Sequence, residues 1–224
     1  MSKILIIVPY RDREEHFNIF INECYPILKK CIPNIKILFV EQNVGKLFNR
    51  GKILNVGLKE NIDKYDSFIL HDIDFIPDEK TIMNMYTNND YDVLRIIIPH
   101  SLSCGLICKF KNDVLKRVNG FPNYIWGWGI EDRALYYRCR ALKFNISVSQ
   151  QQFCKFKQLH HKSNARGYVG ETKQISDTED YIFNKASSQE QIEHIQKSGL
   201  NNLDYTIIQK KNINDDIEII TVDI

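Results

Sequence analysis

The sequence of 224 residues contains no long apolar run. Its N-terminus has a continuous apolar segment only at residues 4–8. A membrane-spanning helix needs roughly 20 such residues, and the core of a signal peptide is also longer than this segment. We therefore expect a soluble, intracellular (cytoplasmic) chain with no membrane segment. Because 43% of the residues are hydrophobic, the chain can still bury the core of one globular domain.

An excess of charge of one sign is also missing. The chain has 30 Lys and Arg residues against 28 Asp and Glu residues, which gives a net charge of +2. No basic run is interleaved with aromatic residues, so the electrostatic signature of a nucleic-acid-binding protein is absent. Neither an internal repeat nor a low-complexity tract is present. Charge therefore identifies no partner and argues against nucleic acid.

The six cysteines form no Cys-x-x-Cys pair and have no zinc-ribbon spacing. Most are expected to be buried thiols. Cys104 and Cys108 are the only close pair, and in an extended segment their side chains would share a face. A zinc site or a disulfide there remains open, although a pair of buried thiols is favoured.

Apolar patterning predicts an α/β fold. Strands are expected at residues 4–8, 35–40 and 67–70, with helices at about 14–30 and 48–58 between them. This alternation is typical of a parallel sheet covered by helices. Glycines at 51 and 57 within the second helical segment indicate close packing or contact.

The rest of the chain adds further elements. Residues 162–178 are polar, contain glycine and lack periodic apolar positions, which predicts a long mobile loop. The other expected strands are 93–98, 146–148, 153–159 (extending the sheet), 205–208 and 217–222 (the last two antiparallel), and the other expected helices are 112–118, one opening at Glu131, and 187–197.

Charged side chains follow two of the expected parallel strands. In such sheets the ligand crevice lies beyond the carboxyl ends of the strands. Arg11 and Arg13 follow the first strand, where guanidinium groups can bind phosphate oxygens in a bidentate manner. Asp72 and Asp74 follow the third strand, and hard carboxylate oxygens suit Mg²⁺ or Mn²⁺ bridging two phosphates.

The adjacent pair His160 and His161 ends an extended segment. Side chains of neighbouring residues in such a segment point to opposite faces, so only one of the two can readily face a given metal. Two solvated loop histidines are the alternative reading. The Asp-x-Asp pair elsewhere in the chain favours the metal reading.

The stretch GFPNYIWGWGIED, residues 120–132, combines both tryptophans of the chain with four glycines and a proline. Glycines around tryptophans allow large rings to move, and carboxylates at a helix N-terminus are favoured in their ionised form. The pattern suits a mobile aromatic flap beside an ionised base. The competing interpretation is a glycine-rich turn that holds two core tryptophans, with Glu131 and Asp132 only capping the helix.

These motifs resemble those of the β-1,4-galactosyltransferases. PYRDREEH (residues 9–16) is similar to the family's PFRNREEH, and FNRGKILNVG (48–57) is similar to FNRAKLLNVG. DIDFIP (72–77) looks like DVDLIP, and residues 119–132 look like NGFPNxxWGWGxED. The last five residues, ITVDI, also resemble the end of the family's domain.

The resemblance implies an inverting enzyme of the GT-A type, Rossmann-like with a mostly parallel sheet and antiparallel C-terminal strands, that uses a UDP-sugar and Mn²⁺. Residues 1–224 would form a single catalytic domain, with a nucleotide-sugar-binding half (1–100) and an acceptor-binding half (101–224). It would transfer galactose from UDP-galactose to a sugar hydroxyl of a glycan in a β-1,4 linkage.

The resemblance also implies roles for individual residues. Asp132 would be the general base, Glu131 an acceptor contact and Trp128 the flap tryptophan. Asp74 would bind manganese together with a histidine of the pair, His161 being slightly favoured over His160. The substrate-binding positions would be Pro9, Arg11, Arg13, Arg50, Asp72, Ser103, Gly105 and Gly129.

Three departures from the family pattern bear on specificity. Arg133 and Ala134 stand where the family continues with acidic residues, which indicates a different acceptor site. Ser103 stands where the vertebrate enzymes have a donor-gating tyrosine, so UDP-N-acetylgalactosamine is an alternative donor. The family's membrane anchor and stem are missing. A catalytically silent glycan-binding module and a UDP-sugar hydrolase remain alternatives, although retention of Asp74, Asp132 and both arginines argues against the former.

Overall fold

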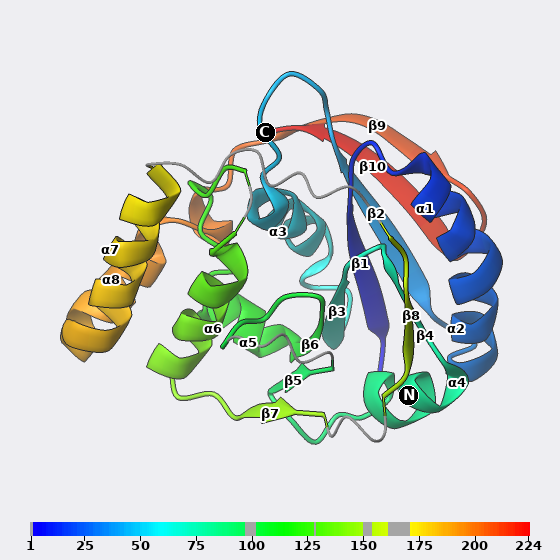
Figure 1. The fold of residues 1–224 in the computed structure, drawn as a ribbon, viewed down its shortest axis with the longest axis horizontal. Coiled ribbons are helices and arrows are strands. Elements are labelled where there is room, and N and C mark those ends of the chain that lie inside the picture. The colour runs from blue at the N-terminus through cyan, green and yellow to red at the C-terminus, as the bar shows by residue number, and fades with distance from the viewer. Residues whose placement is uncertain (1, 97–101, 128, 150–153, 161–170) are drawn as a thin grey trace.

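The structure is a computed structural model that describes residues 2–96, 102–127, 129–149, 154–160 and 171–224 (Figure 1). The strands are β1 (Ile4–Tyr10), β2 (Lys36–Gln42), β3 (Ser67–His71), β4 (Phe75–Pro77), β5 (Val93–Arg95), β6 (Ile107–Lys111), β7 (Ile146–Val148), β8 (Phe156–Gln158), β9 (Thr206–Asn212) and β10 (Ile217–Asp223). The α-helices are α1 (Glu14–Ile19), α2 (Tyr25–Cys31), α3 (Arg50–Asn61), α4 (Glu79–Thr81), α5 (Asn112–Arg117), α6 (Glu131–Ala141), α7 (Glu171–Lys185) and α8 (Ser188–Lys197). Two π-helical turns, Phe20–Cys24 and Ile82–Tyr86, and a 3₁₀ turn, Leu200–Asn202, complete the elements.

An eight-stranded sheet in the order β7-β5-β6-β3-β1-β2-β10-β9 forms the centre of the fold. Strands β3, β1, β2 and β10 are mutually parallel, as the strand–helix alternation predicted. Strand β9 is antiparallel to β10, which confirms the expected antiparallel C-terminal pair. The parallel strands are apolar along most of their length because both faces of the sheet are covered.

Alternate residues of β1 pack into two separate cores. Leu5 and Ile7 join the core beneath α3, α5 and α6, whereas Ile6 and Val8 join the core beneath α1 and α2. Helix α3 lies very close to the sheet, since a Cβ atom built on Gly57 would lie 2.8 Å from Ile7 Cγ2. The expected reason for a glycine within this helix is therefore confirmed.

The structure corrects two sequence-based expectations. Strand β8 does not extend the main sheet but pairs with β4 in a separate two-stranded sheet, because residues 75–77 form an antiparallel ladder with it. The loop predicted for residues 162–178 is wrong for its second part, since α7 begins at Glu171. Residues 162–170 lie outside the described ranges.

The cysteines are free thiols, so the disulfide considered for Cys104 and Cys108 is not formed. The Cys104 thiol instead shares hydrogen bonds with the thiols of Cys108 and Cys139, all three being buried in the core between the sheet and α6. The described residues contain no cluster of three or more His, Cys, Asp or Glu side chains suited to a metal. Within these ranges no helix has both the length and the apolar content required to cross a membrane.

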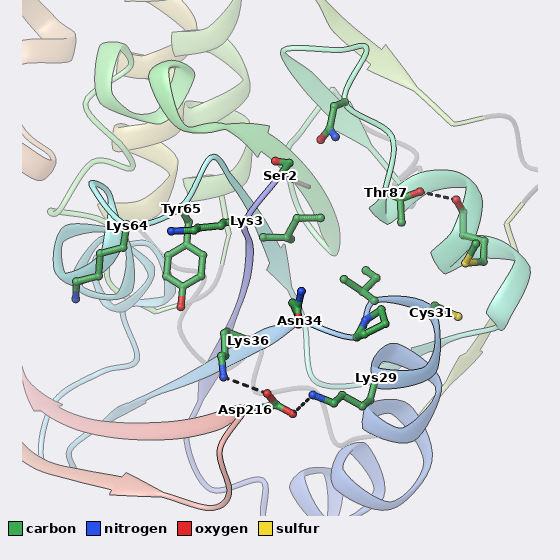
Figure 2. Close-up of a pocket in the computed structure, with 15 residues that line it drawn as sticks. Ser2, Lys3, Lys29, Cys31, Asn34, Lys36, Lys64, Tyr65, Thr87 and Asp216 are labelled. Carbon is green, nitrogen blue, oxygen red and sulfur yellow. Dashed lines mark hydrogen bonds and ion pairs between the residues drawn. The ribbon is translucent and has the colours of Figure 1, made fainter.

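A cavity of about 1040 Å³ lies where β1 and β2 begin (Figure 2). Asp216 binds two lysines at its edge, Lys29 at 2.6 Å and Lys36 at 3.1 Å. Hydrogen bonds from Lys29, Tyr25 and Lys36 outweigh partial burial and lower the pKa of Asp216 to about 2. These contacts fasten α2 and β2 to the start of β10. No residue expected at the functional site lines this cavity, which is at the opposite edge of the sheet from that site.

Candidate active site

The carboxyl ends of β1, β2 and β3 meet at one edge of the sheet, as parallel pairing requires. Ile7 of β1 lies opposite Leu70 of β3, so the chain that follows Pro9 runs beside the chain that follows His71. Pro9 is itself buried and pairs with Val40 of β2. The sheet therefore brings the segment of Arg11 and Arg13 near the segment of Asp72 and Asp74.

Arg50 is the hub of the charged side chains at this edge. It is the first residue of α3, directly after Asn49, whose side chain accepts a hydrogen bond from Lys52 N and caps the helix. The Arg50 guanidinium donates to Asp72 Oδ1 from Nε at 2.9 Å and from Nη2 at 2.7 Å. Its Nη1 donates to Asp132 Oδ1 at 2.6 Å.

Glu131 is the third carboxylate in this cluster, with Oε1 3.8 Å from Arg50 Nη1. Burial disfavours the guanidinium charge, but the three carboxylates outweigh burial and hold the pKa of Arg50 above its usual value. One guanidinium thus faces three carboxylates, and the cluster carries an excess of negative charge when all of them are ionised.

The helix cap at the start of α6 differs from the simple capping interpretation. The residue before the helix is Ile130, in a left-handed conformation with φ 63°, and no side chain caps the helix there. A branched residue at positive φ is strained. Glu131 and Asp132 therefore face Arg50 and the sheet edge, which supports the site interpretation of this stretch.

Burial dominates the protonation of both carboxylates. It raises the pKa of Asp132 to about 8, against the lowering effect of Arg50, and the neighbouring Glu131 and Asp72 add to the increase. Burial likewise raises the pKa of Glu131, again against Arg50. The expectation that the helix N-terminus keeps these groups ionised is therefore wrong for the free protein. A carboxyl group with a pKa near neutrality is well suited to proton transfer.

The segment 103–106 is fastened between the two acidic positions. Cys104 N donates to the backbone oxygen of Asp132 at 3.0 Å, and Asp72 N donates to Leu106 O at 2.9 Å. Gly105 faces the Asp132 carboxylate so closely that an added Cβ would lie 2.3 Å from Oδ2. Ser103 is buried beside them, with 6% of its surface exposed. The structure thus brings Ser103 and Gly105 to the expected base.

Arg11 is held over the loop that leads into α3. Its Nη1 donates to Lys46 O at 2.9 Å, and its guanidinium lies 4.9 Å from the centre of the Phe48 ring. Arg13 directly precedes α1, at the same edge of the sheet. Both arginines are partly exposed and remain reachable by a ligand.

The β4–β8 pair brings the histidine segment to the Asp-x-Asp motif. Leu159 N donates to Asp74 O at 2.7 Å, so His160 follows directly beside the aspartate backbone. Asp74 is 7% exposed, whereas the His160 side chain is exposed. His161 lies outside the described residues. A carboxylate next to an imidazole is a donor set that fits Mn²⁺ better than Mg²⁺.

The segment before α6 is held from the side of α3. Gly127 N donates to Phe48 O at 2.8 Å, and Lys52 Nζ lies 5.9 Å from the centre of the Trp126 ring. Gly127 and Gly129 have positive φ values of 85° and 100°, which glycine adopts without strain. Trp128 lies outside the described residues.

Sequence reasoning missed two residues that support this segment. The Asn55 side chain binds both N and O of Phe121 and donates to Asn123 Oδ1 at 2.9 Å. Asn55 is fully buried in an otherwise apolar part of α3, and a polar residue at such a position was the available signal.

Comparison with known proteins agrees with this geometry. A family model described as the N-terminal region of glycosyl transferase group 7 matches residues 1–89, and one described as the N-terminal domain of galactosyltransferase matches residues 89–162. The chain is 29% identical to β-1,4-galactosyltransferase 4 of Mus musculus over 171 residues, which cover 72% of this chain and 49% of that protein. It is also 29% identical to human β-1,4-galactosyltransferase 6 over 182 residues, covering 76% and 47%. The chain thus spans about half the length of these relatives.

Solved structures share the fold. The catalytic domain of Drosophila β1,4-galactosyltransferase 7, in complex with xylobiose, superposes with a TM-score of 0.79 at 22% identity, covering 99% of this chain and 94% of that one. A mannosyltransferase from Pyrobaculum calidifontis, in complex with GDP-Man and Mn²⁺, gives a TM-score of 0.57 at 12% identity, covering 87% and 69%. The fold is the GT-A type. On its motifs, its architecture and the family models that together cover residues 1–162, this chain belongs to glycosyl transferase group 7, the family of the β-1,4-galactosyltransferases.

Proposed function

We propose that the protein transfers galactose from UDP-galactose to a sugar hydroxyl of a glycan, with inversion at the anomeric carbon and in a β-1,4 linkage. The observation that carries the proposal is the contact of Arg50 with both Asp72 and Asp132. It joins the carboxyl end of β3, the start of α3 and the start of α6 in one site. Relatives named for this activity and the family models support the choice of galactose.

Asp132 is the general base. Its carboxylate accepts the proton of the acceptor hydroxyl while the acceptor oxygen forms a bond to the anomeric carbon of the donor. The bond from that carbon to the diphosphate oxygen breaks, and its electron pair leaves with UDP. Because Asp132 and Glu131 are neighbours at the same edge, Glu131 is positioned to hold the acceptor by a second hydroxyl.

The departing diphosphate needs compensating positive charge. Arg11 and Arg13 supply it from the end of β1, at the edge where the family resemblance places the nucleotide. Asp74 and a histidine of the 160–161 pair would hold Mn²⁺, which when bound offsets charge on the diphosphate. The related Drosophila enzyme has been solved as a mutant with manganese, UDP-Gal and xylobiose, which supports both the donor and the metal.

Arg50 has two partners to exchange during this cycle. In the free protein it occupies Asp132 Oδ1, the group that must receive the proton. A donor phosphate or sugar oxygen near Arg50 would compete for the guanidinium and loosen this pairing. We therefore expect Asp132 to become available as a base when the donor is in place.

The test is a transfer assay with UDP-galactose, Mn²⁺ and a panel of acceptors that includes N-acetylglucosamine, xylose and xylobiose. Product linkage and anomeric configuration are read by NMR, and Asp132→Asn is the control. A β-1,4-linked product formed by the wild type alone is the expected result. Release of UDP at the same rate without any acceptor would show a UDP-sugar hydrolase instead, and glycan binding without turnover would show a silent binding module.

A further inference from the structure

The helix pair α7–α8 contacts the flap segment, residues 120–130, at a buried carboxylate that the proposed reaction does not use. Helices α7 and α8 pack on each other and on α6, at the end of the molecule away from α1 and α2 (Figure 1). Glu179 of α7 is 1% exposed although it is an acidic residue. Of its two carboxylate oxygens, Oε2 has no hydrogen-bond partner among the residues that the structure describes. A carboxylate buried in this way costs stability, so a specific contact must explain it.

The other oxygen, Oε1, makes that contact. It accepts a hydrogen bond from the hydroxyl of Tyr124, a residue of the flap segment, and it lies 2.7 Å from His194 Nε2 of α8. Tyr124 Oη also lies 3.3 Å from His194 Nε2. Burial, with Glu179 nearby, raises the pKa of Tyr124, so its hydroxyl keeps the proton that it donates. One carboxylate oxygen therefore joins the flap segment to both helices.

The residue next to Tyr124 is held from the opposite side. Asn123 binds Asn55 and Asn49 of α3 through its side-chain and backbone oxygens, at 2.9 Å each. Its backbone N receives support from Ser198 Oγ at 2.8 Å, just after α8. Residues 123 and 124 are thus the point where the α3 side and the α7–α8 side both grip the flap segment. Arg50, at the start of α3, and Asp132, at the start of α6, flank this point.

Arg138 reinforces the same region from α6. It is fully buried and donates to Gly120 O at 2.9 Å and to Ser198 O at 2.8 Å. Its charge and that of Glu179 interact. The start of the flap segment is therefore fixed by Arg138, while its middle depends on Tyr124 and Glu179.

We infer that Glu179 is a positioning residue: through Tyr124 it sets the placement of the flap segment and hence of Asp132 at the end of that segment. The inference deepens the proposed function and rests on it for its kinetic consequence, but its structural part does not. Both tryptophans of the chain, Trp126 and Trp128, lie in the flap segment, so intrinsic tryptophan fluorescence reports on this segment alone.

The experiment compares Glu179→Ala, Glu179→Gln and Tyr124→Phe with the wild type in the full chain. Asp177→Ala is the matched control, because Asp177 is an exposed acidic residue of the same helix. For each variant, the tryptophan emission maximum, acrylamide quenching, Tm, kcat and the KM of each substrate are measured. Glu179→Gln keeps an oxygen that can accept from Tyr124, so it should resemble the wild type.

We expect Glu179→Ala and Tyr124→Phe to increase acrylamide quenching and to lower kcat by about 10- to 100-fold, since small misplacements of a reacting group cost on this order. The KM for UDP-galactose should stay within about twofold, because the nucleotide contacts lie elsewhere. Asp177→Ala should change nothing.

Wild-type quenching and kcat in both Glu179→Ala and Tyr124→Phe, with only Tm lowered, would overturn the inference. The same holds if Glu179→Gln is as impaired as Glu179→Ala while Tyr124→Phe is silent, because the hydrogen bond would then not matter. If Glu179→Ala does not fold, Tyr124→Phe decides, since it removes one hydroxyl only. If the wild type transfers no galactose, the fluorescence arm still decides the inference, and only the proposed function fails.

Discussion

The carboxylate of Asp132 lies directly against the α-carbon of Gly105. A Cβ atom on Gly105 would lie 2.3 Å from Asp132 Oδ2 and 2.9 Å from Asp132 Cγ. No real side chain tolerates such distances, so the position of the candidate base depends on the absence of a side chain at residue 105.

The first prediction follows from this contact. Gly105→Ala adds one methyl group and should push the Asp132 carboxylate away from its place beside Arg50. We expect a loss of kcat of about 10²-fold, the scale of a 1 Å misplacement. Far-UV circular dichroism and UDP affinity should be unchanged. Wild-type kcat in Gly105→Ala would mean that Asp132 works in another position.

The second prediction concerns the base itself. Asp132→Asn should lower kcat by about 10² to 10⁴, the usual contribution of a general base, with UDP binding largely retained. A rate within threefold of the wild type would rule out this role.

The protonation of Asp132 also predicts a pH dependence. Its folded-state pKa is raised to about 8, so the carboxylate form grows as pH rises through this value. In the wild type, kcat/KM should therefore increase up to about pH 8 and then level off, whereas the residual rate of Asp132→Asn should lack this step.

The same shift has a consequence for stability. Between the pKa of the unfolded chain, about 4, and about 8, the folded state binds the extra proton, so the contribution of Asp132 to stability falls as pH rises. Asp132→Asn should thus have a higher Tm than the wild type at pH 8, and the gap should shrink towards pH 4. Thermal unfolding at several pH values measures it.

The third prediction concerns the hub. Arg50→Ala leaves Asp72, Asp132 and Glu131 without their shared cation, and removing one partner of a buried ion pair costs about 3–5 kcal/mol. We expect the free energy of unfolding to fall by this order. A second change, Asp72→Asn, should recover part of the loss in the Arg50→Ala background yet destabilise the wild type. Additive effects in this double-mutant cycle would contradict the coupling.

The fourth prediction addresses the metal. Asp74→Ala should lose Mn²⁺-dependent UDP binding together with activity. His161→Ala should raise the Mn²⁺ concentration required, and His160→Ala should do so less. Calorimetric titration of UDP with Mn²⁺ varied distinguishes the variants. An unchanged Mn²⁺ requirement in both histidine variants would remove the histidine from the site.

The fifth prediction concerns donor choice. Ser103 is small and lies beside Cys104 and Gly105 at the base, so we expect space for an acetamido group on the donor. UDP-galactose should be used and UDP-N-acetylgalactosamine tolerated, while Ser103→Tyr should narrow the choice to galactose by about 10- to 200-fold. The measurement is kcat/KM for both donors in both proteins. Rejection of the acetamido sugar by the wild type would show that residue 103 is not the gate.

The parallel part of the sheet could be predicted because its strands are apolar runs separated by helices. Strand β6 could not, since Ile107–Lys111 contains lysines. Lys109 is only 4% exposed, and its ammonium group donates to Tyr86 O, Asn88 O and Asn89 Oδ1. Oxygens from about 20 residues earlier thus satisfy the buried charge, and local pattern shows nothing of this.

The candidate site was predictable as a set of residues but not as an arrangement. Motifs placed Arg50 near the donor, yet its contact with Asp132 joins residues 82 positions apart. The raised pKa of Asp132 likewise comes from burial and from Glu131 and Asp72, which only the packed structure brings together. Gly105 was expected at the substrate, whereas the structure places it against the base.

The position of β10 in the sheet has a consequence for biosynthesis. Ile217 of β10 pairs with Ile37 of β2, 180 residues earlier in the chain. While the ribosome makes those residues, one edge of β2 has unpaired backbone groups in a highly apolar strand. Exposed edges of this kind pair readily with other chains. The nascent chain therefore depends on chaperone protection of β2 until β10 emerges, and slow translation of the second half should increase aggregation.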